Sequence, residues 1–197
     1  MEQDVIDTLA GIEPGSALDR VRQRRPGARK EAQASYRALF TPDDFAGVAA
    51  SERFALAAFV AGLYGEPATA AFYTAALAQS GPSEALRGAI EAAVAAASGA
   101  GPYGRYPAGP LSREDRDGPV YRVEAGTRAT LGPRLAAGFE HMHVLALHPR
   151  DAAPADLQAL LDAGWSTADI VTISQIAAFL SFQIRVVAGL RTLAAAG

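Results

Sequence analysis

Apolar residues recur along most of the chain every three or four positions, the spacing that places them on one face of an α-helix. Alanine-rich stretches with this spacing are separated by proline and glycine. No window shows the alternation of apolar and polar residues that a strand requires. The pattern therefore predicts an all-α fold, and the length of 197 residues fits a single domain spanning 1–197.

Proline, glycine and capping residues set the expected ends of the helices. Pro26-Gly27 is expected to break one helix, Ser51 to cap another, and Ser166 with Asp169 to form a start resembling a capping box. The predicted helices span residues 5–10, 16–25, 28–40, 52–64, 67–79, 82–98, 131–147, 154–163 and 167–195.

A segment dense in glycine and proline, residues 99–119, divides these helices into two groups. The chain is accordingly expected to consist of an N-terminal helical extension (1–50), a first helical half (51–98), the irregular connection (99–119) and a second helical half (120–197). Such long irregular segments are uncommon inside compact domains. We expect this one to lie on the surface and to pack against a partner subunit.

Composition narrows the function classes. The formal net charge is -3 and one fifth of the residues are charged, which suggests neither nucleic acid nor a membrane as a partner. The N-terminus lacks a secretory signal pattern, and the most apolar stretch, Ile170 to Leu180, is too short to span a membrane, so a cytoplasmic location is expected. The chain contains no cysteine, which excludes disulfides, thiolate metal sites and thiol catalysis.

Two segments carry a family resemblance: SERFALAAFVAGLYGEPATAAFYTAAL, which begins at Ser51, and LLDAGWSTADIVTISQIAAFLSFQIRVVAGL, which ends at Leu190. Together they resemble the carboxymuconolactone decarboxylase and alkylhydroperoxidase D superfamily, and the second segment resembles its peroxidase-related branch. The resemblance implies an all-α fold of the alkylhydroperoxidase D type with extra N-terminal helices. It also implies assembly into homo-oligomers (dimers, trimers or hexamers) and chemistry without a cofactor.

The thiol peroxidases of this superfamily use a CxxC pair at the start of a helix, with a histidine and a glutamate as proton relay. Aligning Tyr64-Gly65 with the family's turn places Glu66 and Thr69 on the two cysteine positions and Tyr73 on the histidine position. Phe54 falls on the glutamate position. Peroxide reduction through a disulfide is therefore not expected. Glu66 also suits a plain role as an acidic residue at the positive end of a helix.

The last helix is apolar almost all round, and its few polar residues form a stripe. Ser174, Ser181 and Arg185 share this stripe with the small residues Ala178 and Ala188. Such a stripe indicates close helix packing around a paired charge, or the wall of a ligand pocket. The residues expected to line a pocket are Glu66, Thr69, Tyr73, Ser181 and Arg185.

All three histidines lie between Phe139 and His148, and they are the best candidates for chemistry. On a helix, Glu140 and His143 share one face, whereas His141 and His148 share another. A histidine with a carboxylate one turn away suits a general acid or base. The predicted catalytic residues are therefore His143, Glu140 and His141, although these histidines also suit a core or an interface.

The sequence supports a metal site less than it supports acid–base chemistry. Glu140 and His143 form half of a di-iron motif, but no histidine remains for the second half. A mononuclear site with one further carboxylate stays open, and neither a metal nor an organic cofactor is expected. The basic residues between Arg20 and Arg37 are interleaved with acidic ones, which favours a solvated helix face over phosphate binding.

Two functional hypotheses follow. The first is an oligomeric, carboxymuconolactone decarboxylase-like protein that binds a small organic molecule and, if catalytic, uses acid–base chemistry. The second is a non-catalytic subunit or scaffold that pairs with a cysteine-containing relative through residues 99–119 and the N-terminal helices.

Overall fold

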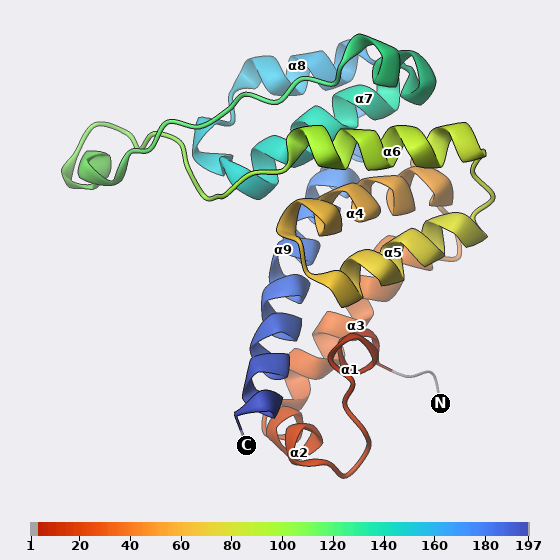
Figure 1. The fold of residues 1–197 in the computed structure, drawn as a ribbon, viewed down its shortest axis with the longest axis vertical. Coiled ribbons are helices and arrows are strands. Elements are labelled where there is room, and N and C mark those ends of the chain that lie inside the picture. Colours follow the sequence, from red (N-terminus) through yellow and green to blue (C-terminus); the bar gives the residue numbers. More distant parts are fainter. Residues whose placement is uncertain (1–3, 197) are drawn as a thin grey trace.

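The computed structural model describes residues 4–196, and within that range the protein is all-helical (Figure 1). One isolated β-bridge, between Gly104 and Arg116, is present in the same range. The helices are α1 (Val5–Ala10), α2 (Ala17–Gln23), α3 (Pro26–Phe40), α4 (Ala50–Tyr64), α5 (Pro67–Gln79), α6 (Glu84–Ala97), α7 (Ala125–Leu147), α8 (Pro154–Asp162) and α9 (Thr167–Ala195), with short 3₁₀ turns η1 (Pro110–Glu114) and η2 (Pro149–Asp151). The prediction of an all-α protein is confirmed.

Helix α4 is the centre of the core, and α5, α6, α7 and α9 surround it (Figure 1). Residues 55–61 of α4 are all buried, as its almost continuous run of apolar residues requires. Gly62 brings α4 close to α6, because a Cβ at this position would lie 2.6 Å from Cγ1 of Val94. A larger residue at position 62 would push the two helices apart.

The N-terminal helices α1, α2 and α3 lie beside the C-terminal half of α9 (Figure 1), and the end of α3 reaches the main core through Leu39 and Phe40. Val5, Ile6 and Leu9 of α1 pack with Ala32 and Val187 in a small second cluster. Beside it, a buried ion network joins Arg22 and Arg29 to carboxylates of the same region, namely Asp4, Asp7 and Asp19. Two of the basic N-terminal residues are thus internal ion-pair partners.

Several predicted boundaries move in the structure. Pro26 is the first residue of α3 rather than a break before it, because proline fits the first helical turn. Helix α4 begins before Ser51, and Glu52 binds the backbone N–H of Ala49 instead. Helix α7 begins at Ala125 and is interrupted at Gly132, whose φ of 77° precedes Pro133. The predicted start at Leu131 matches only the second part of α7.

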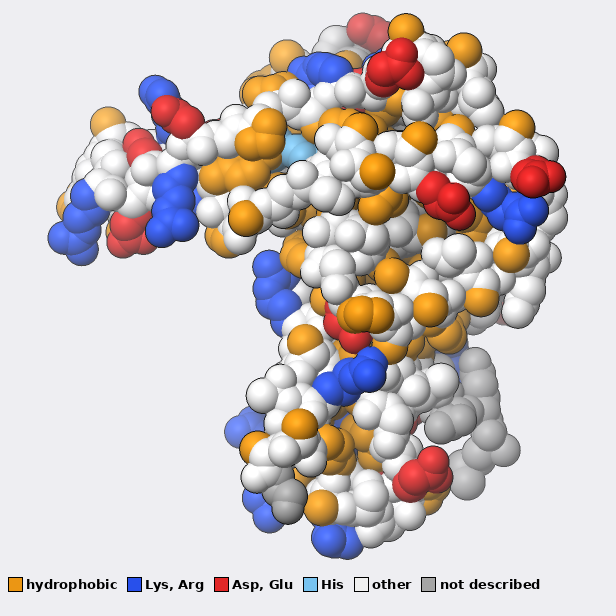
Figure 2. Space-filling model, viewed as in Figure 1, with side chains coloured by type: hydrophobic (Ala, Val, Ile, Leu, Met, Phe, Trp, Pro, Cys, Tyr) orange, Lys and Arg blue, Asp and Glu red, His pale blue; other side chains and the backbone are white. Residues whose placement is uncertain are grey.

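Residues 98–124 connect α6 to α7, and their middle part forms an arm that extends away from the helical body (Figure 1). The outgoing and returning segments of the arm are joined by the Gly104 to Arg116 bridge, and η1 forms its tip. Figure 2 shows charged side chains of both signs gathered on this tip. Between α6 and α7 the described chain is irregular apart from η1, and the connection continues beyond residue 119 to the start of α7.

Helix α9 is, among the described residues, the one helix that is long and apolar enough to cross a membrane. In its most apolar window 44% of the residues are buried inside the protein. It packs against α1, α3, α4, α7 and α8, so it serves as a core helix of this fold.

Candidate functional site

The three histidines belong to the end of α7, where they point in two directions. His141 and His143 are two residues apart, about 200° around a helix, so they face opposite sides of α7. His141 faces α8 and α9, whereas His143 faces α6 and the base of the arm. All three rings are buried. The two sides of α7 therefore have to be described separately.

On the arm side, a hydrogen bond joins His143 and His148, with His143 Nδ1 3.1 Å from His148 Nε2. His148 Nδ1 lies 3.3 Å from Asp151 Oδ2 but makes no hydrogen bond among the described residues. His143 also hydrogen-bonds the backbone of Ala97. Burial, together with the neighbouring His148, lowers the pKa of His143 to about 4. His143 is therefore neutral at physiological pH.

This pair supports the base of the arm. The ring of Tyr103 stacks on His148 with centroids 4.8 Å apart, and the Tyr103 N–H donates to the Leu147 carbonyl. Asp151 accepts a hydrogen bond from the Arg105 N–H at 2.9 Å. The pale-blue histidine surface in Figure 2 appears where the arm joins the body. His143 and His148 thus form a structural connection between the end of α7 and the arm.

The pairing of His148 differs from the sequence prediction. The i and i+7 spacing placed His148 on the face of His141, but the helix ends at Leu147. The backbone of His148 is not helical (φ -144°, ψ 56°), and its side chain therefore points toward His143. Glu140 and His143, expected to act together, also belong to different surroundings.

On the opposite side, His141 has an incomplete set of partners. Its Nε2 lies 2.9 Å from the Ser174 hydroxyl of α9. Its Nδ1 is buried and has no hydrogen-bond partner among the described residues. Burial lowers the pKa of His141, while the carboxylate of Asp156 acts in the opposite direction. A buried, unpaired imidazole nitrogen is unfavourable unless a bound molecule satisfies it.

The ring of His141 lines a small cavity that we call the α7–α8 hollow. Its volume is about 110 Å³, and its wall consists of Arg122, Ala137, Glu140, His141, Val144, Asp156 and Ala159. Residues 137, 140, 141 and 144 share one face of α7, and residues 156 and 159 come from α8. The hollow offers apolar walls with an imidazole, two carboxylates and a guanidinium.

Glu140 is held in place at the edge of the hollow. Its carboxylate accepts a hydrogen bond from the Val123 N–H at 2.9 Å and binds the guanidinium of Arg128. Arg122 lies 4.0 Å from the same carboxylate, and its side chain is 60% exposed. Arg122 also donates a hydrogen bond to the Tyr121 carbonyl at 3.0 Å. Its guanidinium thus has one backbone partner at the edge of the hollow, whereas Glu140 is held by two.

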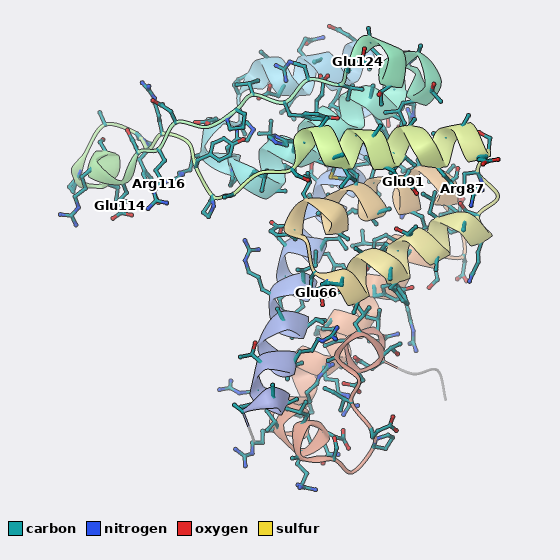
Figure 3. The ribbon with its side chains drawn as sticks, viewed as in Figure 1. Glu66, Arg87, Glu91, Glu114, Arg116 and Glu124 are labelled. Atoms are coloured by element: carbon teal, nitrogen blue, oxygen red, sulfur yellow. The ribbon has the colours of Figure 1, made fainter. Side chains whose placement is uncertain are left out.

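The other predicted pocket residues connect α9 to α4 and α5 instead. Glu66 caps α5: it accepts from the Thr69 N–H at 2.7 Å and the Thr69 hydroxyl at 2.6 Å, and it pairs with Arg191. Figure 3 shows Glu66 at the turn between α4 and α5. These bonds lower the pKa of Glu66, so it remains a carboxylate with structural partners.

Tyr73, Ser181 and Arg185 are likewise engaged. The Tyr73 hydroxyl donates to Gln183 Oε1 at 2.7 Å in the fully buried core. Burial raises the pKa of this hydroxyl well above its usual range. Ser181 hydrogen-bonds the Tyr64 hydroxyl at 2.8 Å, and the Arg185 guanidinium lies over the Tyr64 ring. Arg185 is exposed rather than buried. The five predicted pocket residues do not meet the histidines in one site.

A second, larger hollow lies between α4, α5 and α6. Its volume is about 290 Å³, and small apolar residues such as Ala58, Ala70 and Ala95 line it. Arg87 and Glu91 stand at its edge on α6 (Figure 3). Sequence reasoning did not predict this hollow, and no buried polar group with an unpaired atom borders it among the described residues.

Neither metal coordination nor known relatives add to this description. Within residues 4–196, no group of three or more histidine and acidic side chains is arranged to hold a metal ion. We find no match for this chain among models of protein families, curated proteins or solved structures. The functional argument therefore rests on the geometry of the α7–α8 hollow.

Proposed function

We propose that this protein binds a small organic molecule, a short carboxylate or lactone, in the α7–α8 hollow, and that His141 acts there as a general acid and base without a cofactor. The single observation that supports this proposal is the unpaired, buried Nδ1 of His141 beside a cavity. The resemblance to the carboxymuconolactone decarboxylase superfamily supports the same class of ligand. His141 thereby takes the role that the sequence suggested first for His143.

The surroundings of His141 suit proton transfer. A neutral imidazole has one N–H donor and one acceptor, and Ser174 occupies only Nε2. Nδ1 therefore remains available to exchange a proton with a ligand. When the ring takes up that proton, the carboxylates of Asp156 and Glu140 in the wall of the hollow stabilise the imidazolium. Arg122 supplies the charge that a carboxylate ligand needs.

The size of the hollow limits the ligand. With a volume of about 110 Å³, the hollow is small for a ligand pocket. A larger ligand would have to extend past Arg122 toward solvent. We therefore expect selectivity for compact molecules such as acetate or γ-butyrolactone over aromatic acids.

Calorimetric titration with acetate, succinate and γ-butyrolactone tests the proposal. We expect saturable binding of at least one of them, and loss of that binding in His141→Leu. Arg122→Gln should weaken the binding of the carboxylates more than the binding of the lactone, because the lactone carries no charge. Arg113→Gln, an exposed arginine of the arm, is the matched control. Binding that is unchanged in His141→Leu would refute the proposal.

One observation, the projecting arm, favours a second function. In this function the protein is a non-catalytic scaffold that pairs with a cysteine-containing relative. Leu111 at the tip of the arm is 48% exposed, and Val120 on the segment that returns to α7 is 68% exposed. Exposed apolar residues on an extended arm suit contact with another subunit.

The arm can be shortened without disturbing its base. Gly104 and Arg116 already exchange backbone hydrogen bonds of 2.8 and 3.3 Å, so a two-residue Asn-Gly turn can replace residues 105–115. The scaffold function predicts that the shortened protein has a lower mass in solution by light scattering. An unchanged mass would argue against it.

A further inference from the structure

Helix α9 carries an exposed stripe on the side that faces away from the core. Val171, Gln175, Ala178, Phe182, Arg185 and Gly189 are all exposed, and they follow one another at alternating steps of four and three residues. This alternation is the spacing of the contact positions in a coiled coil. Phe182, in the middle, is 46% exposed, which is unusual for a large aromatic side chain.

The stripe is complementary to itself when its direction is reversed. Reversal about Leu180 pairs Phe182 with Ala178, Gln175 with Arg185, and Val171 with Gly189. The first and third pairs combine a large side chain with a small one. The remaining pair combines a side-chain carbonyl with a guanidinium that lacks an ion-pair partner among the described residues. From these pairings we propose that two copies of this chain form an antiparallel dimer through α9, related by a two-fold axis near Leu180.

A hollow beside the stripe has the position and the lining needed to accept the ring of Phe182 in the pair of Phe182 with Ala178. It lies between α3 and α9, is lined by Ser35, Ala38, Leu39, Gln175, Ala178, Phe179 and Phe182, and has a volume of about 400 Å³. In the antiparallel arrangement, Phe182 of the second copy lies next to Ala178, on the α3 side of the stripe. Its ring therefore enters this hollow, and the same contact occurs twice across the axis.

The overall shape agrees with this arrangement. The molecule is broad where α6, α7 and α8 lie and narrow at α1, α2 and α3 (Figure 1). An antiparallel dimer places the broad end of each copy beside the narrow end of the other. A lipid surface is a poorer occupant of the stripe, because Gln175 and Arg185 lie within it and the opposite face of α9 is packed against other helices.

Sedimentation equilibrium and light scattering of the full chain provide the first test. The expected mass is twice that of the chain. Phe182→Asp should weaken the dimer by roughly a hundredfold or more, because two buried rings are lost per dimer. Leu161→Asp, on an exposed apolar residue of α8, is the matched control and should leave the dimer intact. A monomeric wild-type protein, or a dimer that tolerates Phe182→Asp, would overturn the proposal.

Spin labels test the direction of the helices without altering Phe182. Because the chain contains no cysteine, Val171→Cys and Gln175→Cys each create a single labelling position. With a rise of 1.5 Å per residue, the antiparallel dimer predicts axial separations of about 27 Å and about 15 Å for the paired labels. Equal, short separations at both positions would show a parallel dimer and overturn the proposal. The proposal would also be overturned if the protein floated with phosphatidylcholine vesicles and Phe182→Asp abolished this flotation.

Discussion

Each side of α7 carries a buried histidine, but the two histidines differ in their hydrogen-bond partners. On the arm side, His143 is hydrogen-bonded to His148 and Ala97 and lies among the rings of Tyr121 and His148. On the α8 side, His141 has one partner, one unpaired nitrogen and an adjacent cavity. A buried histidine with every partner in place stabilises the fold, whereas one with a free nitrogen at a cavity is available for a ligand. The following predictions test this contrast.

The largest effect is expected for His143→Ala. The substitution leaves a cavity and removes the partners of His148 and of the Ala97 backbone, so the free energy of unfolding should fall by about 3 kcal/mol. Urea denaturation measures this loss. A decrease below about 1 kcal/mol would show that His143 is not the structural member of the pair.

Acid should destabilise the protein through the same residue. The pKa of His143 is about 4 in the folded protein, below the value of the unfolded chain, so the unfolded state binds more protons between pH 6.5 and pH 4. Stability is therefore lost as the pH falls through this window, by roughly 3 kcal/mol at most. Urea midpoints measured across the window in wild type and in His143→Gln check this. Equal slopes in the two proteins would contradict the assignment.

A smaller effect is expected at the base of the arm. Tyr103→Phe removes the hydrogen bond from the Tyr103 hydroxyl to the Pro119 carbonyl, 2.6 Å in length, but keeps the stacking on His148. We expect a loss of about 1 kcal/mol in unfolding free energy. Hydrogen exchange of the arm amides should accelerate in the variant, while the amides of α4 keep their wild-type rates.

The smallest effect on stability is expected for His141→Leu. Leucine has a similar volume, and the substitution removes a buried nitrogen that lacks a partner, so the unfolding free energy should change by less than about 1 kcal/mol. The same variant should lose ligand binding. A loss as large as that of His143→Ala would make His141 structural as well.

The sequence predicted the helices well because their ends carry local signals. Gly11 and Gly65 end their helices with positive φ, and Ser166 with Asp169 caps α9 as expected. The start of α7 was missed because Gly132 and Pro133 looked like a terminus, whereas the structure places helix on both sides of this break. Local signals determine where a helix ends. They do not show at which of these points the tertiary structure lets the helix continue.

The candidate site was predicted only in part. Residues 137, 140, 141 and 144 have the spacing of one helix face, and this signal could have grouped Glu140 with His141 rather than with His143. Arg122 and Asp156 come from the segment before α7 and from α8, so only the packing of these segments brings them to the hollow. The partnership of His148 with His143 depends on a non-helical backbone at one residue, which no periodicity reveals.

The most direct test of the central claim is a nuclear magnetic resonance titration of the three histidine rings with acetate at neutral pH. The claim predicts that the ring signals of His141 shift and saturate, while those of His143 and His148 remain unchanged. Saturable shifts at His143 with none at His141, or no shift at any histidine with acetate, succinate or γ-butyrolactone, would contradict it.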